Sequence, residues 1–341
     1  MKEIKNTKNK SILKKIFVKV CRLLGYEIID QSNATIPTMG IAVNDNTNIL
    51  GKKSISLPLG EVKITRRVKS LDIIIRTCME VGMLTQNKKR IFEKHKSEYS
   101  LRSINSIIKS YINSEVLKNI EVNFTVVDHN SSEKNLNRLK KLFEKHSINC
   151  NLINLETKEF EKKIKKVNEK NENVTSNQLS NMANIYKSLI LSKKCKDLIY
   201  FIEDDYIHDL SSLEKMVLTY ERISSQINDE LFICSSDYPY LYNNVNNTNI
   251  LLGNNHHWRK IDESLCSFLT SNLMVNKHWR ELTSMCEFEH YPFEKPLHNI
   301  YKNEFCISPI PSLSVHFTNI NSIFGLSPNI NWKKFWDDNE I

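Results

Sequence analysis

The feature that most constrains the fold is an alternation of strand-like and helix-like segments through the centre of the chain. Apolar, β-branched runs predict four buried strands: "LDIIIRTCM" (71–79), "VNFTVVDHNSS" (122–132), "NCNLINLE" (149–156) and "DLIYFIEDDY" (197–206). The stretches between them, such as 97–114 and 176–194, place apolar residues at helical spacing. Strands that alternate with helices need crossover connections, which favour parallel pairing. We therefore predict an α/β fold with a mainly parallel central sheet flanked by helices.

Three carboxylates, Glu203, Asp204 and Asp205, stand side by side where the fourth predicted strand ends. In parallel sheets, ligands bind beyond the carboxyl ends of the strands. Alternate side chains of a strand share a face, so Glu203 and Asp205 are expected to point together and Asp204 away. Such oxygen ligands suit Mg²⁺ or Mn²⁺, which bridges to phosphate oxygens. The alternative is a helix start capped by Asp205 or Asp209 without a metal, which explains one carboxylate but not three.

Two of these elements, taken in order, resemble those of nucleotide-sugar glycosyltransferases with a GT-A fold, particularly the family-two type. "TVVDHNSS" resembles the second-strand element whose aspartate contacts the nucleotide, and Asp128 occupies that place. The stretch 176–206 resembles the one in which an Asn-bearing helix leads to a DxD-like element. The resemblance covers residues 70–210 in order and the remainder more loosely. It implies a GT-A-type, Rossmann-like sheet.

The resemblance also implies residues that bind the sugar donor and a divalent cation, Mn²⁺ or Mg²⁺. Glu203 and Asp205 take the two acidic places of the DxD-like element, which becomes ExD, and Asp205 is the usual metal ligand. A late histidine, His316, resembles a further metal or diphosphate ligand; the alternative is a histidine hydrogen-bonded in the domain wall. The donor-binding residues implied are Thr77, Asp128, Asn181, Glu203, Asp204 and Asp205.

The first strand departs from the family pattern, because it ends in "RTCM". This departure leaves the role of Thr77 open. Two roles are also open for Arg76: it faces a phosphate, or it is structural.

Inverting transfer needs a carboxylate that accepts the proton of the acceptor hydroxyl. In related enzymes this base lies late in the chain near a helix start, so the resemblance favours Glu294, which precedes "KPLHNIY". Asp237 and Glu263 are rival candidates. A surface glutamate at a helix start is the alternative reading of Glu294.

For the acceptor sugar, the sequence offers a polar and aromatic cluster at His257, Trp258 and Arg259. Aromatic faces and charged hydrogen-bond donors commonly hold sugars. The alternative is that Trp258 is buried in the core and the histidines lie at the surface.

The positive charge of the chain is concentrated at its N-terminus. The net charge is +9, and the first 25 residues hold eight basic residues and one acidic residue, a net charge of +7. Because the rest is nearly balanced, nucleic acid is not an expected partner. Residues 10–28 place apolar side chains at helical spacing with lysines opposite, which suits an anionic membrane surface. The alternative is a terminal helix packed on the domain.

Cysteine spacing and the lack of long apolar runs bear on location. The eight cysteines form no CxxC pair, which favours buried reduced thiols in a cytoplasmic protein. No apolar stretch approaches the ~20 residues that span a bilayer, and no signal peptide is expected. We divide the chain into a basic amphipathic helix (1–28), a β-rich or irregular lead-in (29–69), a nucleotide-sugar-binding half (70–210) and an acceptor-side half with a C-terminal tail (211–341).

Together with these observations, the resemblance implies a metal-dependent glycosyltransferase of the cytoplasm, peripheral on the inner face of the cell membrane, and the resemblance alone implies that it inverts the anomeric centre. It would move a sugar from a nucleotide diphosphate donor to a hydroxyl of a cell-surface glycan or lipid-linked precursor. One alternative is a nucleotidyltransferase, which would normally show a Gly-rich phosphate loop; the seven glycines form none. The other is a catalytically silent scaffold held at membranes by residues 10–28.

Overall fold

The computed structural model describes residues 12–26, 63–80, 90–243, 245, 247–317 and 323–341. The chain forms two compact units, residues 1–63 and 64–341. The first contains helix α1 (Ile12–Leu23), which confirms the predicted N-terminal helix. Most of the predicted lead-in, 29–62, lies outside the described residues.

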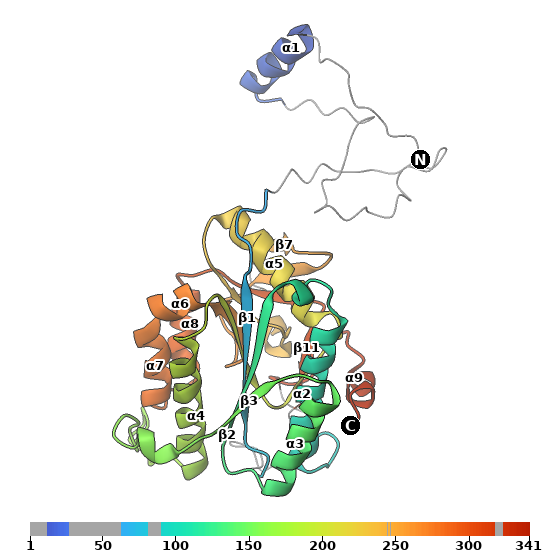
Figure 1. Ribbon diagram of the computed structural model, residues 1–341. Coiled ribbons are helices and arrows are strands. Elements are labelled where there is room, and N and C mark those ends of the chain that lie inside the picture. The colour runs from blue at the N-terminus through green and yellow to red at the C-terminus, as the bar shows by residue number, and fades with distance from the viewer. Residues whose placement is uncertain (1–11, 27–62, 81–89, 244, 246, 318–322) are drawn as a thin grey trace. The chain divides into compact units, whose positions relative to one another are not determined.

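The second unit is built on a nine-stranded sheet with the order β3-β2-β1-β4-β9-β6-β10-β8-β7 (Figure 1). All four predicted strands are present and pair in parallel. They are β1 (Ser70–Thr77), β2 (Glu121–Asp128), β3 (Cys150–Asn154) and β4 (Leu198–Glu203). The predicted α/β architecture is confirmed, and β1 lies between β2 and β4.

Beyond β4 the sheet becomes mixed. The strands there are β6 (Phe232–Ile233), β7 (Ile250–Leu252), β8 (His257–Lys260), β9 (Phe268–Ser271) and β10 (Cys306–Ile310). Strand β9 runs antiparallel to both β4 and β6, β10 is parallel to β6, and β7 and β8 form an antiparallel pair. These five strands of the second half of the chain therefore extend the same sheet.

A small second sheet joins two distant parts of the chain. Strand β5 (Tyr206–His208) follows the acidic cluster directly and pairs antiparallel with β11 (Ser314–His316). Its register sets Tyr206 opposite His316. This pairing carries the late histidine to the acidic cluster.

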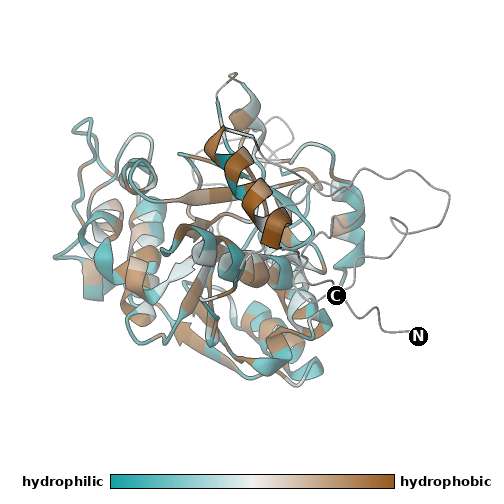
Figure 2. Cartoon of the chain, turned by 90° about the horizontal axis from the view of Figure 1, so that it is seen from above, coloured by the Kyte–Doolittle hydropathy of each residue, from teal (hydrophilic) through white to brown (hydrophobic). Residues whose placement is uncertain are grey.

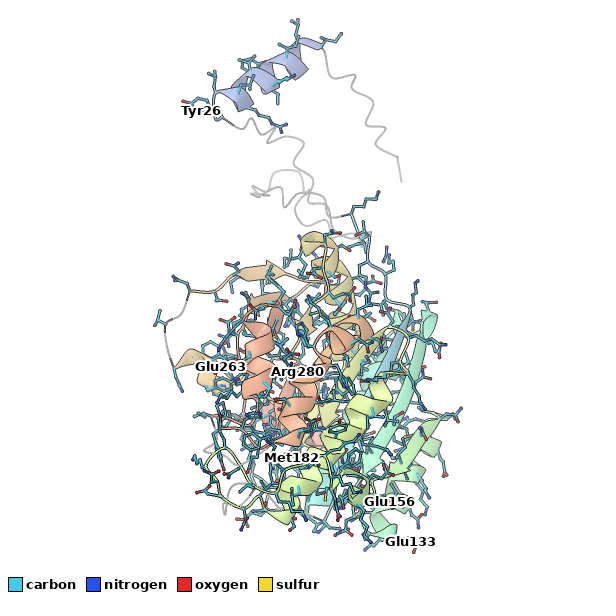
Figure 3. All side chains as sticks on the ribbon, turned by 90° about the vertical axis from the view of Figure 1, so that its left-hand side faces the viewer. Tyr26, Glu133, Glu156, Met182, Glu263 and Arg280 are labelled. Carbon is cyan, nitrogen blue, oxygen red and sulfur yellow. The ribbon has the colours of Figure 1, made fainter. Side chains whose placement is uncertain are left out.

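Helices cover both faces of the large sheet (Figures 1 and 3). One layer contains α2 (Lys96–Asn113), α3 (Glu133–Lys145) and α5 (Ser212–Ile227). The other contains α4 (Ser176–Ser192), α6 (Asn272–Lys277), α7 (Trp279–Glu287) and α8 (Lys295–Tyr301). Short 3₁₀ helices cover Leu117–Asn119, Thr157–Phe160 and Pro239–Tyr242.

The strand residues alternate between two cores, one under each helix layer. Ile73 and Ile75 of β1 pack with α2 and α5, whereas Ile74 packs with α4 and α7. In Figure 2 the strands are mainly brown and the loops mainly teal. Burial on both faces explains why the predicted strands read as continuous apolar runs. All eight cysteines are free, and four of them are buried.

The C-terminal helix α9 (Trp332–Asp338) packs on α2 and the small sheet. Trp336 stacks on Phe92 with ring centroids 4.2 Å apart. The guanidinium of Arg102 lies over the Trp336 ring, 4.4 Å from its centroid. These contacts hold the tail against the edge of the body, next to the segment that carries Phe317.

Arg66, at the described end of the lead-in, ties that segment to the sheet. Its guanidinium contacts both oxygens of Asp197, just before β4, and its Nε donates to Glu230 at 2.8 Å. We expect Arg66→Ala to lower the free energy of unfolding by about 3 kcal/mol, because two largely buried carboxylates lose their cation. Urea denaturation measures this loss.

Lys118→Ala is the matched control for Arg66→Ala. Lys118 forms an exposed ion pair with Glu115, so its loss should cost no more than about 0.5 kcal/mol. Equal losses in the two variants would contradict a structural role for Arg66.

Candidate functional site

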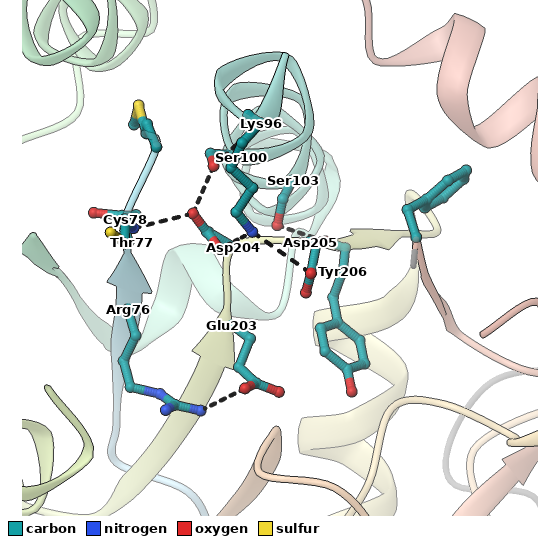
Figure 4. A network of polar contacts seen from close by, with 12 residues as sticks. Arg76, Thr77, Cys78, Lys96, Ser100, Ser103, Glu203, Asp204, Asp205 and Tyr206 are labelled. Carbon is teal, nitrogen blue, oxygen red and sulfur yellow. Dashed lines mark hydrogen bonds and ion pairs between the residues drawn. The ribbon is translucent and has the colours of Figure 1, made fainter. Parts of the chain in front are cut away.

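The three neighbouring carboxylates diverge where β4 ends (Figure 4). Glu203 points to Arg76 of the adjacent strand, with Oε1 3.2 Å from Nη2. Asp204 points to the start of α2, and Asp205 lies in the turn that leads to β5. Asp204 and Asp205 both approach Lys96 Nζ, at 2.6 and 3.5 Å, whereas Glu203 turns to Arg76. The prediction that Glu203 and Asp205 point together, away from Asp204, is therefore wrong.

Asp204 is fully engaged inside the protein. It is 6% exposed. Its carboxylate accepts hydrogen bonds from Lys96 Nζ (2.6 Å), Ser100 Oγ (2.5 Å) and the Cys78 amide (3.3 Å). The predicted donor-binding role of Asp204 is therefore corrected: its carboxylate joins α2 to the end of β1. A buried carboxylate needs such partners, and here both of its oxygens accept hydrogen bonds from within the protein.

Asp205 lies among positively charged groups. Its Oδ1 is 3.4 Å from His316 Nε2, and its Oδ2 is 3.4 Å from Arg90 Nη1 and 3.5 Å from Lys96 Nζ. Burial acts to raise the pKa of Asp205, but Lys96, His316 and Arg90 hold it well below its ordinary value. Asp205 therefore stays ionised at neutral pH.

His316 is oriented by groups on both sides of its ring. Its ring stacks on Tyr206 with centroids 4.5 Å apart, and its Nδ1 lies 2.7 Å from the Phe324 carbonyl oxygen. Since a carbonyl only accepts, Nδ1 carries a proton and donates it, and Nε2 faces Asp205. Burial lowers the pKa of His316, but Asp205 and then Glu203 raise it above its ordinary value overall.

Asp205 and His316 have the chemistry of a divalent-cation site. A metal-binding histidine usually donates from its other ring nitrogen to a carbonyl, as Nδ1 does here, and a cation at Nε2 would replace the proton that Asp205 and Glu203 favour on this ring. Ligand atoms bound octahedrally at ~2.1 Å lie about 3 Å apart, close to the observed separation of 3.4 Å. These two residues therefore fit Mn²⁺ or Mg²⁺.

The predicted third metal ligand, Glu203, is turned toward Arg76. Across the described ranges, no three His, Cys, Asp or Glu side chains are grouped so that they could hold a metal ion. Two protein ligands would leave the other positions to phosphate oxygens and water.

Arg76 gathers the predicted residues on the other side of β4. It is 6% exposed. Besides Glu203, it contacts the Asn181 Oδ1 at 3.3 Å and the Cys266 carbonyl oxygen at 3.4 Å. The structure thus brings Asn181 and Glu203 together through one guanidinium.

Glu294 joins this side of the site from the start of α8. It is half-buried, and its Oε1 lies 3.8 Å from Cys266 Sγ. Burial, together with the negative charge of Glu203, raises the pKa of Glu294 to about 7, although Arg76 opposes the shift. A carboxylate with a pKa near neutrality can accept and release a proton efficiently. Glu294 is the residue that was favoured as the base, ahead of Asp237 and Glu263.

Thr77 and Asp128 contact each other instead of facing a ligand. The Thr77 hydroxyl donates to Asp128 Oδ1 at 2.6 Å, and Ser131 donates to both Asp128 oxygens. The two side chains are 1% and 2% exposed. Their polar groups close the turn after β2, so the predicted nucleotide contact has no exposed carboxylate to make it.

The predicted acceptor cluster is not formed. Neighbouring residues of β8 point to opposite faces, so His257 is exposed while Trp258 is 0% exposed. Arg259 pairs with Asp237, and Tyr242 donates to the same carboxylate. Trp258 is therefore a core residue, which corrects its predicted role.

The same contacts bear on the choice of base. Asp237 is 1% exposed and is held by Arg259 and Tyr242, so it is unsuited to meet an acceptor. Glu263 is exposed. Burial raises the pKa of Asp237 as well, but only Glu294 among the three candidates combines partial exposure with a pKa raised to about 7.

Lys96 and Arg90 were not among the predicted site residues, yet they bring two positive charges to Asp205. Lys96 opens a helix and Arg90 ends a basic run, so each reads as an ordinary surface cation in the sequence. Only the packing of α2 and the small sheet against the end of β4 places them at the acidic cluster.

No protein-family model and no curated protein sequence matches the chain. Similar solved structures include galactosyltransferase LgtC with donor and acceptor sugar analogs (14% identity, TM-score 0.32), covering 68% of this chain and 66% of that one. The bifunctional glycosyltransferase WbbM (11%, 0.30) covers 67% and 35%. UDP-glucose pyrophosphorylase complexed with UDP-glucose (8%, 0.36) covers 75% and 96%. The chain thus spans less than two thirds of LgtC and WbbM, and this likeness assigns it no activity.

Proposed function

We propose that the protein is a nucleotide-sugar glycosyltransferase that depends on Mn²⁺ or Mg²⁺. The proposal rests on two features near the ends of β1 and β4: a pair of side chains that can bind a cation, and a carboxylate that can accept a proton. Asp205 Oδ1 and His316 Nε2 lie 3.4 Å apart, where both would reach one cation, and burial raises the pKa of Glu294 to about 7. The charge of Glu203 raises the pKa of both His316 and Glu294, so it lies within electrostatic reach of each.

Asp205 and His316 Nε2 would hold the cation, which would neutralise charge on the departing nucleotide diphosphate. Lys96 and Arg90 approach the same carboxylate from the protein side. They add positive charge next to the position of the phosphate oxygens, where charge builds as the bond to the sugar breaks. Arg76 holds Glu203 and Asn181 on the opposite side.

Glu294 would act as the base. It accepts the proton of the acceptor hydroxyl while that oxygen bonds to the anomeric carbon and the bond from carbon to phosphate oxygen breaks. Attack opposite the leaving group inverts the anomeric centre. We propose a hydroxyl of a cell-surface glycan or lipid-linked precursor as acceptor, which rests on the resemblance of residues 70–210.

The need for a base separates this proposal from a nucleotidyltransferase that activates a sugar phosphate. There the attacking group is a phosphate oxygen, which carries no proton to remove at neutral pH. In that reaction a glutamate with a raised pKa would have no proton to remove from the attacking group. Glu294 therefore favours transfer to a hydroxyl over nucleotidyl transfer.

The test is a titration of the full chain with UDP and GDP, with and without Mn²⁺, followed by thermal unfolding. Ligands that bind only the folded state raise the unfolding temperature. We expect a rise with one of the nucleotides that requires the cation, and turnover of a sugar linked to that nucleotide. The absence of any cation-dependent rise would contradict the proposal and favour a catalytically silent scaffold.

A further inference from the structure

Helix α1 divides its surface between apolar and basic side chains. At about 100° per residue, the apolar residues that share one face fill an arc of roughly 140°. They are Ile12, Leu13, Ile16, Phe17, Val20, Leu23 and the following Leu24. The basic residues Lys14, Lys15, Lys19 and Arg22 fall in the remaining arc. The helix contains no acidic residue.

The apolar arc is exposed over its whole length. Leu23, Leu13 and Phe17 are 80%, 79% and 62% exposed. A continuous apolar surface of this kind marks a site that another body covers. The occupant can be inferred from the charge that accompanies it.

The charge around this arc favours an anionic surface. Seven of the nine net positive charges of the chain lie in its first 25 residues. Lys19 lies at the edge of the apolar arc, where its stem can cover apolar surface while its ammonium reaches outward. A broad apolar face bordered by lysines is typical of helices that lie in a bilayer interface.

The C-terminal end of α1 also suits a bilayer interface. Gly25 adopts a left-handed conformation with φ +82 and ends the helix. Tyr26 follows and is 71% exposed (Figure 3). Tyrosine is favoured at the level of lipid headgroups because it is apolar with a polar tip. No helix within the described part of the chain has the length and apolar character to cross a membrane.

We propose that α1 is an anchor that lies in the interface of a bilayer containing anionic lipids. Its apolar arc enters the boundary of the acyl chains, and its basic side chains contact lipid phosphates. The proposal is independent of the proposed enzyme, because membrane binding needs neither the cation nor the nucleotide.

The test uses the full chain and sedimentation with vesicles of phosphatidylcholine, with or without phosphatidylglycerol. We expect binding to the mixed vesicles that weakens as salt rises. Phe17→Asp should lower the binding constant by at least about tenfold, because it sets a charge in the apolar arc. Leu210→Asp is the matched control, because Leu210 is 50% exposed in the other unit and its change should leave binding unaltered.

A second pair of variants tests the charge. Lys15→Gln with Lys19→Gln should weaken binding to the anionic vesicles by roughly 25-fold, about fivefold per lysine. Lys140→Gln with Lys141→Gln removes the same charge from the exposed face of α3 and should have no effect. Equal binding to both kinds of vesicle would overturn the proposal. Unchanged vesicle binding of the Phe17→Asp variant would also overturn it. A third contradicting outcome is that the unaltered chain does not bind the vesicles and that Phe17→Asp lowers the unfolding temperature of the protein.

Discussion

Replacing Asp205 with Asn is expected to lower the rate of sugar transfer by about 100- to 1,000-fold. In the proposed site Asp205 and His316 would hold the cation, and an amide in place of the carboxylate removes the charged one of the two. Lys96 and Arg90 also lose the anion that they share. Transfer rates measured across a range of Mn²⁺ concentrations, together with the cation-dependent rise in unfolding temperature, should both fall.

Asp204→Asn is the matched control, since it removes the same charge one residue away. Asp204 holds α2 through Lys96 and Ser100, so its change should lower stability by about 1–3 kcal/mol. We expect that variant to keep cation-dependent nucleotide binding. Transfer that is unchanged in Asp205→Asn would end the metal-dependent mechanism.

Replacing Glu294 with Gln is expected to lower transfer by about 100- to 10,000-fold while nucleotide binding with Mn²⁺ is retained. The amide has nearly the same shape but cannot accept the proton of the acceptor hydroxyl. In the unaltered protein, kcat/KM should rise with pH through about 7, because only the ionised carboxylate acts as base. The residual rate of the variant should lack this rise.

Stability supplies an independent readout for Glu294. Its pKa rises from the ordinary 4.5 to about 7 in the folded protein, so the folded state holds more protons than the unfolded state between these values. Stability contributed by this group therefore falls as pH rises from 4.5 through 7. Glu294→Gln removes this dependence, and its stability relative to the unaltered protein should be greater at pH 8 than at pH 5. Loss of nucleotide binding together with transfer would contradict its role as base.

The fold could be predicted because its determinants are local. The apolar residues Leu71 and Ile73–Ile75 of β1 are buried on both faces of the sheet, and such a strand requires a central place covered by helices on each side. The mixed pairing beyond β4 could not be predicted in the same way. Strands β6 and β9 have two and four residues, and their partners come from distant segments.

The site was predictable in part, for the same reason. Asp205, at a strand end, and Glu294, at a helix start, stand out by position alone, and both lie in the assembled site. Asp128 and Trp258 looked equally suited, but packing gave the first a threonine partner and buried the second. The neighbouring sequence does not distinguish the residues that lie in the site from those that packing engages elsewhere.

By itself, the sequence determined the four parallel strands β1 to β4, most of the helices that cover them, and the placing of acidic residues where β4 ends. Tertiary structure alone decided which carboxylates meet solvent, which meet a cation of the protein, and which acquire a raised proton affinity. The reason is physical: secondary structure follows from the periodicity of neighbouring residues, whereas the charge state of a side chain depends on burial and on partners that the fold brings from elsewhere. Asp205 is contacted by Lys96, Arg90 and His316, which come from three separate segments. No local sequence pattern predicts these contacts.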